Sequence, residues 1–179
     1  MSEVEHQEIE QILKDDPFTL FGLQQQFNLD SNDLNTKFRS LQKQYHPDSW
    51  VNSRLSALII MASAHINAAY STLKNPLTRA MALLKLNGIE VNLNNNGNLD
   101  QDFLFEQIEI REQIAESQNS IEKLEHLEHM LKRKQEQIIQ ELTTLFNQHN
   151  FVQALKLTQH LAFYHKLLEV VSNTISKLW

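Results

Sequence analysis

A histidine and an aspartate flank a proline at His46-Pro47-Asp48, directly after a segment with helical periodicity. Proline cannot continue a helix, and it biases the preceding residue away from helical backbone angles, so the tripeptide predicts a turn. An imidazole and a carboxylate at the tip of a turn could bind a partner, because loops between rigid elements often carry function. A turn that only ends a helix is the alternative, and the tripeptide alone leaves both interpretations open.

Two further histidines, His126 and His129, lie three residues apart, and a glutamate precedes each. Residues three apart on a helix are neighbours, so this group could hold a metal ion. An exposed polar helix face is the favoured interpretation, because charged and polar residues are mostly exposed. We therefore predict no metal site and no resident cofactor.

The sequence lacks the motifs of the common catalytic centres. It has no glycine-rich phosphate loop, no nucleophile elbow and no His-Glu-x-x-His pattern. With no cysteine, it can form no disulfide, thiolate metal site or cysteine nucleophile. We predict that the protein is not an enzyme, and a metal-binding helical enzyme remains the third and weakest hypothesis.

Composition limits the other classes of function. Only three glycines and three prolines in 179 residues, with 41% hydrophobic residues, indicate a mostly helical protein. A formal net charge of −6 argues against nucleic acid as the main partner, since that needs a basic surface. The most apolar run, residues 55–64, is too short to span a membrane, and residues 1–16 are too acidic for a targeting signal. We expect a soluble, cytoplasmic protein.

The turn lies between two segments with helical periodicity. Apolar side chains recur on one stripe over residues 32–45: Leu34, Phe38, Leu41 and Tyr45. Asp30 or Ser31 can cap this helix, and Arg39 and Lys43 form a small cationic face on its far side. A longer stripe of the same period follows the turn: Leu55, Leu58, Ile59, Ala62, Ile66, Ala69, Tyr70 and Leu73. Such helices pack as an antiparallel hairpin with the turn at one end.

The rest of the chain predicts a second helical domain. Asn75-Pro76 ends the second helix, residues 77–86 predict one or two more helical turns, and Asn87-Gly88 predicts a C-cap. Asparagine and glycine dominate residues 91–99, which predicts a linker. Three helices then follow, at about 101–117, 120–147 and 151–177, with Ser120 and Asn150 as caps. The predicted fold is all-α, with domains at 17–90 and 100–179 after an extension, 1–16, that is either a short helix or disordered.

One acidic helix carries apolar residues on two sides. Phe103, Ile110 and Ile114 share the direction of the core, whereas Leu104 and Ile108 point a third of a turn away. Phe105 points nearly opposite the core, among three carboxylates: Glu109, Glu112 and Glu116. Either the linker or the N-terminal domain covers these apolar residues, or they form a binding surface of apolar anchors ringed by charge.

These segments resemble a known family. Phe18-Thr19-Leu20-Phe21-Gly22-Leu23, the segment from Phe38 through His46-Pro47-Asp48, and Ile66-Asn67-Ala68-Ala69-Tyr70 resemble a J-domain. Asn75-Pro76-Leu77-Thr78-Arg79-Ala80 and the acidic helix are similar to one branch of the J-domain family, the HscB co-chaperones of iron–sulfur cluster assembly. The similarity covers about residues 17–179, and implies an N-terminal J-domain and a C-terminal three-helix scaffold-binding domain.

The resemblance implies two partners, the DnaK-type ATPase chaperone HscA and the iron–sulfur scaffold protein IscU. The residues implied to engage the chaperone and stimulate its ATPase are His46, Pro47, Asp48, Arg39, Lys43 and Tyr45. Those implied to bind the scaffold are Leu104, Phe105, Ile108, Glu109, Glu112, Glu116 and Phe163. The alternative is a general J-domain adaptor that delivers another client to a DnaK-type chaperone.

The chain departs from the family pattern in two places. Ser49-Trp50 follows the aspartate where relatives usually carry a basic residue and phenylalanine, so part of the cationic surface is missing. No cysteine is present to build the metal-binding N-terminal module of some eukaryotic members, which favours the bacterial form.

Overall fold

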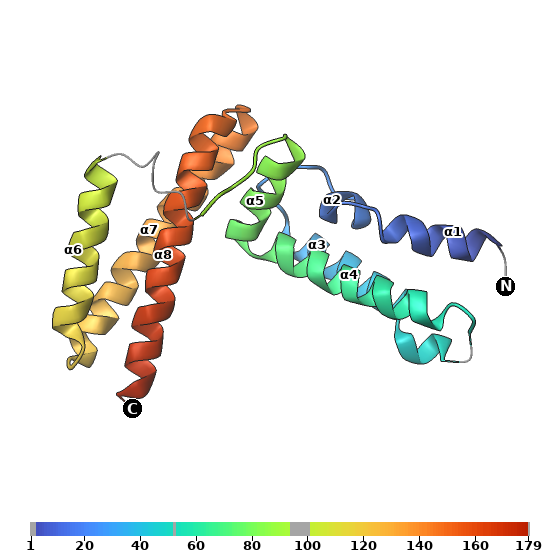
Figure 1. Ribbon diagram of the computed structural model, residues 1–179, viewed down its shortest axis with the longest axis horizontal. Helices are drawn as coiled ribbons and strands as arrows, with labels where there is room; N and C mark the ends of the chain where they lie inside the picture. The colour runs from blue at the N-terminus through green and yellow to red at the C-terminus, as the bar shows by residue number, and fades with distance from the viewer. Residues whose placement is uncertain (1–2, 52, 94–100, 179) are drawn as a thin grey trace. The chain divides into compact units, whose positions relative to one another are not determined.

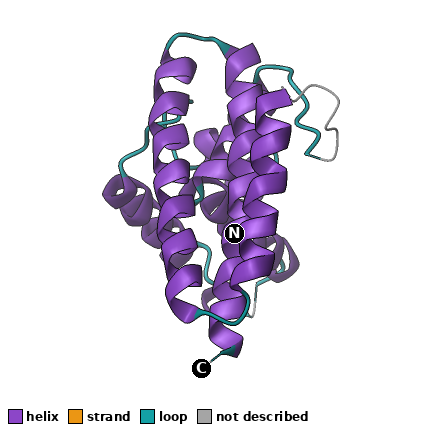
Figure 2. Cartoon of the chain, turned by 90° about the vertical axis from the view of Figure 1, so that its left-hand side faces the viewer, coloured by secondary structure: helices purple, strands orange, loops and turns teal. Residues whose placement is uncertain are grey.

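The computed structural model describes residues 3–51, 53–93 and 101–178. In these ranges every regular element is a helix and no strand occurs, so the all-α prediction is confirmed (Figure 2). The chain divides into two compact units, residues 1–83 and 84–179. Of the linker predicted at 91–99, only residues 91–93 are described, and they are not helical; residues 94–99 lie outside the described residues.

The first helix of the first unit, α1 (Glu3–Ile12), lies in the extension for which the sequence left a choice between helix and disorder (Figure 1). Ile9 is 1% exposed, and α1 contacts α4 (Ser56–Lys74). The backbone carbonyl of Asp15 lies 3.1 Å from Nε2 of His65 on α4, which ties the following segment to the same helix. Residues 3–12 are therefore an ordered part of the first unit.

Helix α2 (Pro17–Leu20) is short and begins at a proline. The Asp16 carboxylate accepts a hydrogen bond from the Phe18 amide at 2.8 Å, and Pro17 lacks the N–H that would otherwise need an acceptor. Phe18 is fully buried. Gly22 follows with a φ of +56°, a left-handed conformation that a side chain would disfavour.

Helices α3 (Ser31–Gln44) and α4 form the predicted hairpin. Asp30 is the N-cap, and its carboxylate accepts a hydrogen bond from the Asn32 amide at 2.8 Å. The rings of Phe38 and Tyr70 stack with centroids 3.9 Å apart, and the Tyr70 hydroxyl donates to Asn35 Oδ1 at 2.8 Å. These contacts fix the two helices on which the turn depends.

Side-chain hydrogen bonds hold the junction between α4 and α5 (Pro76–Leu86). Pro76 has no N–H, so the carbonyl of Thr72, four residues earlier, needs another donor. The Thr78 hydroxyl donates to that carbonyl at 2.8 Å, and the Leu77 amide donates to Asn75 Oδ1 at 2.9 Å. Helix α5 is 11 residues long, more than the one or two turns predicted.

The second unit contains the three predicted helices, α6 (Gln101–Ser117), α7 (Ile121–Asn147) and α8 (Phe151–Lys177). Ser120 and Asn150 cap α7 and α8 as predicted, accepting hydrogen bonds from the amides of Lys123 and Gln153. Helices α7 and α8 pack closely together, and their fully buried side chains include Leu124, Leu131, Leu142 and Val171. The Gln159 side chain donates to the Asn92 carbonyl at 3.2 Å, which holds the described end of the linker against α8.

Candidate protein-interaction surfaces

The predicted turn is present and has hydrogen bonds of its own. His46 has extended backbone angles, as a residue before proline requires, and the short 3₁₀-helix η1 (Pro47–Trp50) follows it. The Asp48 amide donates to His46 Nδ1 at 3.3 Å, and the Ser49 amide donates to the His46 carbonyl at 3.0 Å. The side chain of Asp48 is 89% exposed and that of His46 56%. Both polar groups therefore face solvent.

The hydrogen bond to His46 Nδ1 also determines what the ring offers a partner. Nδ1 can accept from the Asp48 amide only when it carries no proton, so the neutral ring has its hydrogen on Nε2. Among the residues that the structure describes, no hydrogen bond involves Nε2. The turn thus presents an N–H donor and, on Asp48, a carboxylate acceptor.

Trp50 ties the turn to the helix before it. Its indole Nε1–H donates to the backbone carbonyl of Gln44, in the last turn of α3, at 3.2 Å. From the sequence, Ser49-Trp50 is only a missing part of the cationic surface; in the structure, the hydrogen bond of Trp50 holds η1 in place. No sequence pattern predicts that the indole N–H would donate to a helix carbonyl six residues earlier.

Tyr45 lies at the same helix end but is not on the surface. It is buried, and its hydroxyl accepts a hydrogen bond from the side chain of Gln44 at 3.0 Å. Burial, and next the nearby carboxylate of Glu8 on α1, raise the pKa of Tyr45 above its usual value. Tyr45 can support the turn from beneath, but it does not present a contact surface.

The cationic face of α3 is open. Arg39 and Lys43 are both exposed, and within the described part of the chain neither side chain forms a hydrogen bond or an ion pair. Lys37, in contrast, donates to the Gly22 carbonyl at 2.9 Å and lies 3.5 Å from the Asp33 carboxylate. Arg39 and Lys43 are thus the cations on this helix that a partner could engage.

On α6 the helical projection of the core is confirmed. Phe103, Ile110 and Ile114 are buried, whereas Phe105 is 69% exposed and Ile108 52% exposed. Leu104 is half-buried, and the three carboxylates near Phe105 are exposed: Glu109, Glu112 and Glu116. We use "α6 patch" for Leu104, Phe105 and Ile108 together with Phe163. Two exposed large apolar side chains one turn apart are typical of a protein-binding surface.

Phe163, the α8 residue of the α6 patch, packs against α6. Its ring meets the buried ring of Phe103 edge-on, with centroids 5.4 Å apart. The guanidinium of Arg111 lies 5.1 Å from the Phe163 centroid, and Arg111 follows Ile108 by three residues on α6. Phe163 and Ile108 therefore border the same cation. Arg111 was not among the residues singled out from the sequence, because its neighbour comes from another helix.

The inner side of α6 is held to its own unit by polar contacts. Glu106 accepts from Lys134 Nζ at 2.9 Å. Burial and then the Glu106 carboxylate raise the pKa of Tyr164 far above its usual value. These contacts, with the apolar core, fix the rotation of α6, so Phe105 and Ile108 are held outward.

The histidine pair on α7 shows no metal-binding arrangement. His126 and His129 are exposed, and Glu128 instead accepts hydrogen bonds from Lys132 at 3.0 Å and Ser172 at 2.9 Å. In the described ranges, no group of three potential ligands lies close enough to hold a metal ion.

Of the helices that the structure describes, none is both long and apolar enough to cross a bilayer.

Comparison with known proteins places the chain among co-chaperones. Residues 99–172 match the family described as "HSCB C-terminal oligomerisation domain". The chain is 36% identical over 169 residues to the Co-chaperone protein HscB homolog of Haemophilus ducreyi, covering 90% of this chain and 96% of that protein. Chaperone HscB from Vibrio cholerae has a similar structure, with a TM-score of 0.82, 34% identity, and coverage of 92% of this chain and 100% of that one. For human co-chaperone protein HscB the TM-score is 0.83, with 29% identity over 88% of this chain and 81% of that one.

Proposed function

The chain belongs to the HscB family of J-type co-chaperones, and we propose that it stimulates the ATPase of the DnaK-type chaperone HscA and delivers the scaffold protein IscU to it. In this role it aids the maturation of iron–sulfur proteins in the bacterial cytoplasm without catalysing a reaction itself. We propose residues 17–90 as the J-domain and residues 100–179 as the scaffold-binding domain.

The observation that carries the first half of the proposal is the exposed His46 and Asp48 on a hydrogen-bonded turn. A co-chaperone can accelerate hydrolysis only by binding the hydrolysis-competent state of the ATPase better than its resting state. A rigid turn suits this task because little conformational entropy is lost when it binds. Arg39 and Lys43 add a charge that speeds association with an acidic surface, and buried Tyr45 supports the turn.

The α6 patch supports the second half of the proposal. Phe105 and Ile108 are apolar anchors, and Glu109, Glu112 and Glu116 surround them with charge that favours a basic partner segment. A co-chaperone that holds its cargo on one domain and the ATPase on the other raises their effective concentration without any new contact between them.

The test of the turn is the steady-state ATPase rate of HscA with and without IscU. His46→Gln should abolish stimulation, because glutamine cannot reproduce the bonded imidazole, while the affinity for IscU stays unchanged. His6→Gln replaces an exposed histidine of the same unit and should stimulate as wild type does. Stimulation that survives in His46→Gln, or loss of IscU binding in it, would contradict the two-surface proposal.

The test of the patch is the affinity for IscU. The double change Phe105→Ala and Ile108→Ala should weaken binding by at least about 30-fold, as expected when two central apolar anchors are truncated. Val152→Ala, at a 77% exposed position of α8, should bind normally. If the double variant binds IscU as well as the wild type does, the cargo surface lies elsewhere. If the wild type itself does not bind IscU, a general adaptor with another client becomes the better explanation.

A further inference from the structure

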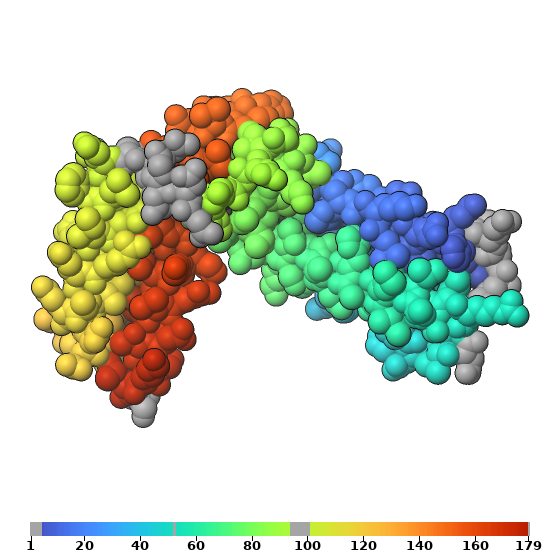
Figure 3. All heavy atoms as spheres, in the orientation of Figure 1, coloured from blue at the N-terminus to red at the C-terminus, as the bar shows by residue number. Residues whose placement is uncertain are grey.

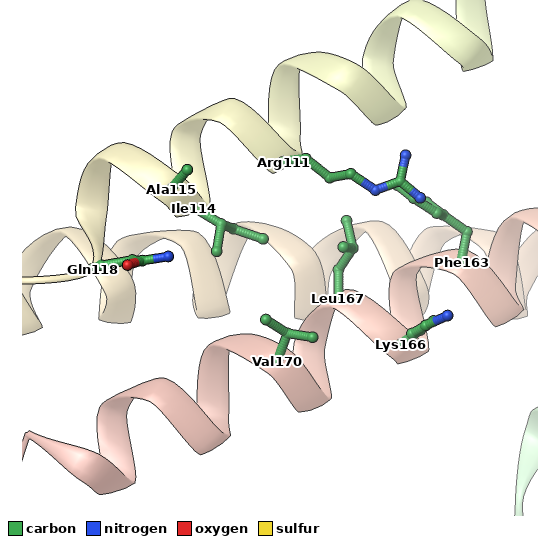
Figure 4. Close-up of a pocket in the computed structure, with 8 residues that line it drawn as sticks. All are labelled: Arg111, Ile114, Ala115, Gln118, Phe163, Lys166, Leu167 and Val170. Carbon is green, nitrogen blue, oxygen red and sulfur yellow. The ribbon is translucent and has the colours of Figure 1, made fainter.

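A hollow of about 320 Å³ opens between α6 and α8, next to the α6 patch (Figure 4). Ile114 and Leu167, both buried, form its floor, and Ala115 and Val170 line its sides. Val170 is 43% exposed. The two helices border one another in the space-filling view, α6 in yellow and α8 in red (Figure 3). We refer to this hollow as the α6–α8 groove.

The groove is continuous with the α6 patch. On α6 the residues Leu104, Ile108, Arg111 and Ala115 are spaced four, three and four apart, so they lie on one stripe of the helix. This stripe is about 16 Å long at 1.5 Å per residue. Phe163 belongs both to the patch and to the groove lining, where the Arg111 side chain extends over it (Figure 4).

Charges of opposite sign flank this stripe. Glu112 and Glu116 are exposed on the side of α6 that faces away from α8. Arg111 and Lys166 line the groove on the side of α8, and among the described residues Lys166 forms no hydrogen bond or ion pair. These opposite charges would orient a partner segment that lies along the stripe. Basic groups of the segment would face the glutamates, and an acidic group would face Arg111 and Lys166.

We propose that the α6–α8 groove is the second half of the scaffold-binding site. It takes an apolar side chain of the scaffold protein already bound at the α6 patch, with a carboxylate of the same segment at Arg111 and Lys166. This inference rests on the proposed function, and it extends the site from the patch to Ala115, Lys166 and Val170, which the family resemblance does not include.

Binding of purified IscU to the full-length protein, measured by isothermal titration calorimetry, tests the groove. Val170→Asp places a carboxylate among apolar walls and should weaken binding by about tenfold. Ala115→Glu, at an exposed position, should do the same without touching the core. Lys166→Glu should weaken binding and reduce its dependence on salt. Val152→Asp introduces the same charge on α8 outside the groove and should bind as wild type does.

The controls separate this inference from the proposed function. Thermal unfolding by circular dichroism shows whether a variant is folded. If Val170→Asp is not folded, Ala115→Glu still tests the groove. If both groove variants bind IscU normally while Phe105→Ala with Ile108→Ala does not, the groove inference is wrong and the proposed function stands. If that double variant also binds normally, the α6 patch is not the cargo surface, and the groove inference fails with it. If the wild type sediments as a dimer and the groove variants sediment as monomers with normal IscU affinity, a second copy of the chain is the occupant and the inference is overturned.

Discussion

Replacing Arg79 by alanine should destabilise the first unit by about 2 kcal/mol, although the residue contacts no proposed partner. Its Nη1 donates to the carbonyl of Leu73 at 2.8 Å, and its guanidinium lies 5.0 Å from the centroid of Phe27. Leu73 is fully buried near the end of α4, where Pro76 interrupts the helix. Without Arg79, the Leu73 carbonyl loses this donor in a place that water reaches poorly.

The size of the expected stability loss follows from these two contacts and from the cost of burying the guanidinium. A hydrogen bond from a charged donor contributes about 1.5–3 kcal/mol, and a cation over an aromatic face contributes about 0.5–1 kcal/mol. Burial reduces the stabilisation from these two contacts, because it disfavours the charged guanidinium and so lowers the pKa of Arg79. In addition, Nε of Arg79 has no hydrogen-bond partner within the described residues. The balance is a loss of about 2 kcal/mol.

Urea unfolding followed by circular dichroism measures this loss. The midpoint for the first unit should fall while the slope stays constant, which shows a change in stability rather than in the area exposed. Arg79→Lys should recover only part of the loss, because an ammonium cannot reproduce the planar fork. Arg54→Ala, at an exposed position of the same unit, should change the free energy of unfolding by less than about 0.5 kcal/mol. An Arg79→Ala variant as stable as the wild type would refute this account of the junction.

Three further outcomes are expected. Hydrogen bonds from Lys132 and then Ser172 hold the pKa of Glu128 below its usual range, so its stabilisation is present above the unfolded-state pKa and is lost as the pH falls through the folded-state pKa. Glu128→Gln should therefore lower the free energy of unfolding by about 1 kcal/mol at pH 7 and by less below about pH 4 in urea titrations, and a constant difference would contradict this. Ile9→Ala should cost about 2–4 kcal/mol in the same assay, since the side chain is buried, and no change would mean that α1 is not docked. Trp50→Phe keeps the ring but removes the bond to α3, so it should reduce stimulation of HscA about threefold with less than about 1 kcal/mol lost in stability; full stimulation would show that the bond does not hold the turn.

The helices of the second unit could be predicted closely because their signals are local. The expected starts and ends near 101, 117, 147, 151 and 177 agree with α6, α7 and α8, and Ser120 and Asn150 cap them. A cap is a contact between residues two or three apart, and the periodicity of a stripe needs only one helix. The same reasoning found the buried and exposed sides of α6.

Contacts between elements distant in sequence could not be predicted in this way. Whether residues 3–12 form a helix depends on the burial of Ile9 against α4, and an isolated helix of ten residues is marginal in water. The groove depends on the distance between α6 and α8, and the periodicity of a single helix does not predict that distance. Arg111 shows this directly: on its own helix it is an exposed cation, and only the position of Phe163 makes it part of a site.

The two proposed surfaces are stabilised by separate sets of contacts, and this determines how their variants should combine. The turn is held by bonds among residues 44–50, on the hairpin of α3 and α4. The α6 patch is held outward by the burial of Phe103 and Ile110 and by the bond between Glu106 and Lys134, all within the second unit. Changes that share no partner are additive in free energy. We therefore expect that variants can remove stimulation and cargo binding one at a time, which a single continuous surface would not allow.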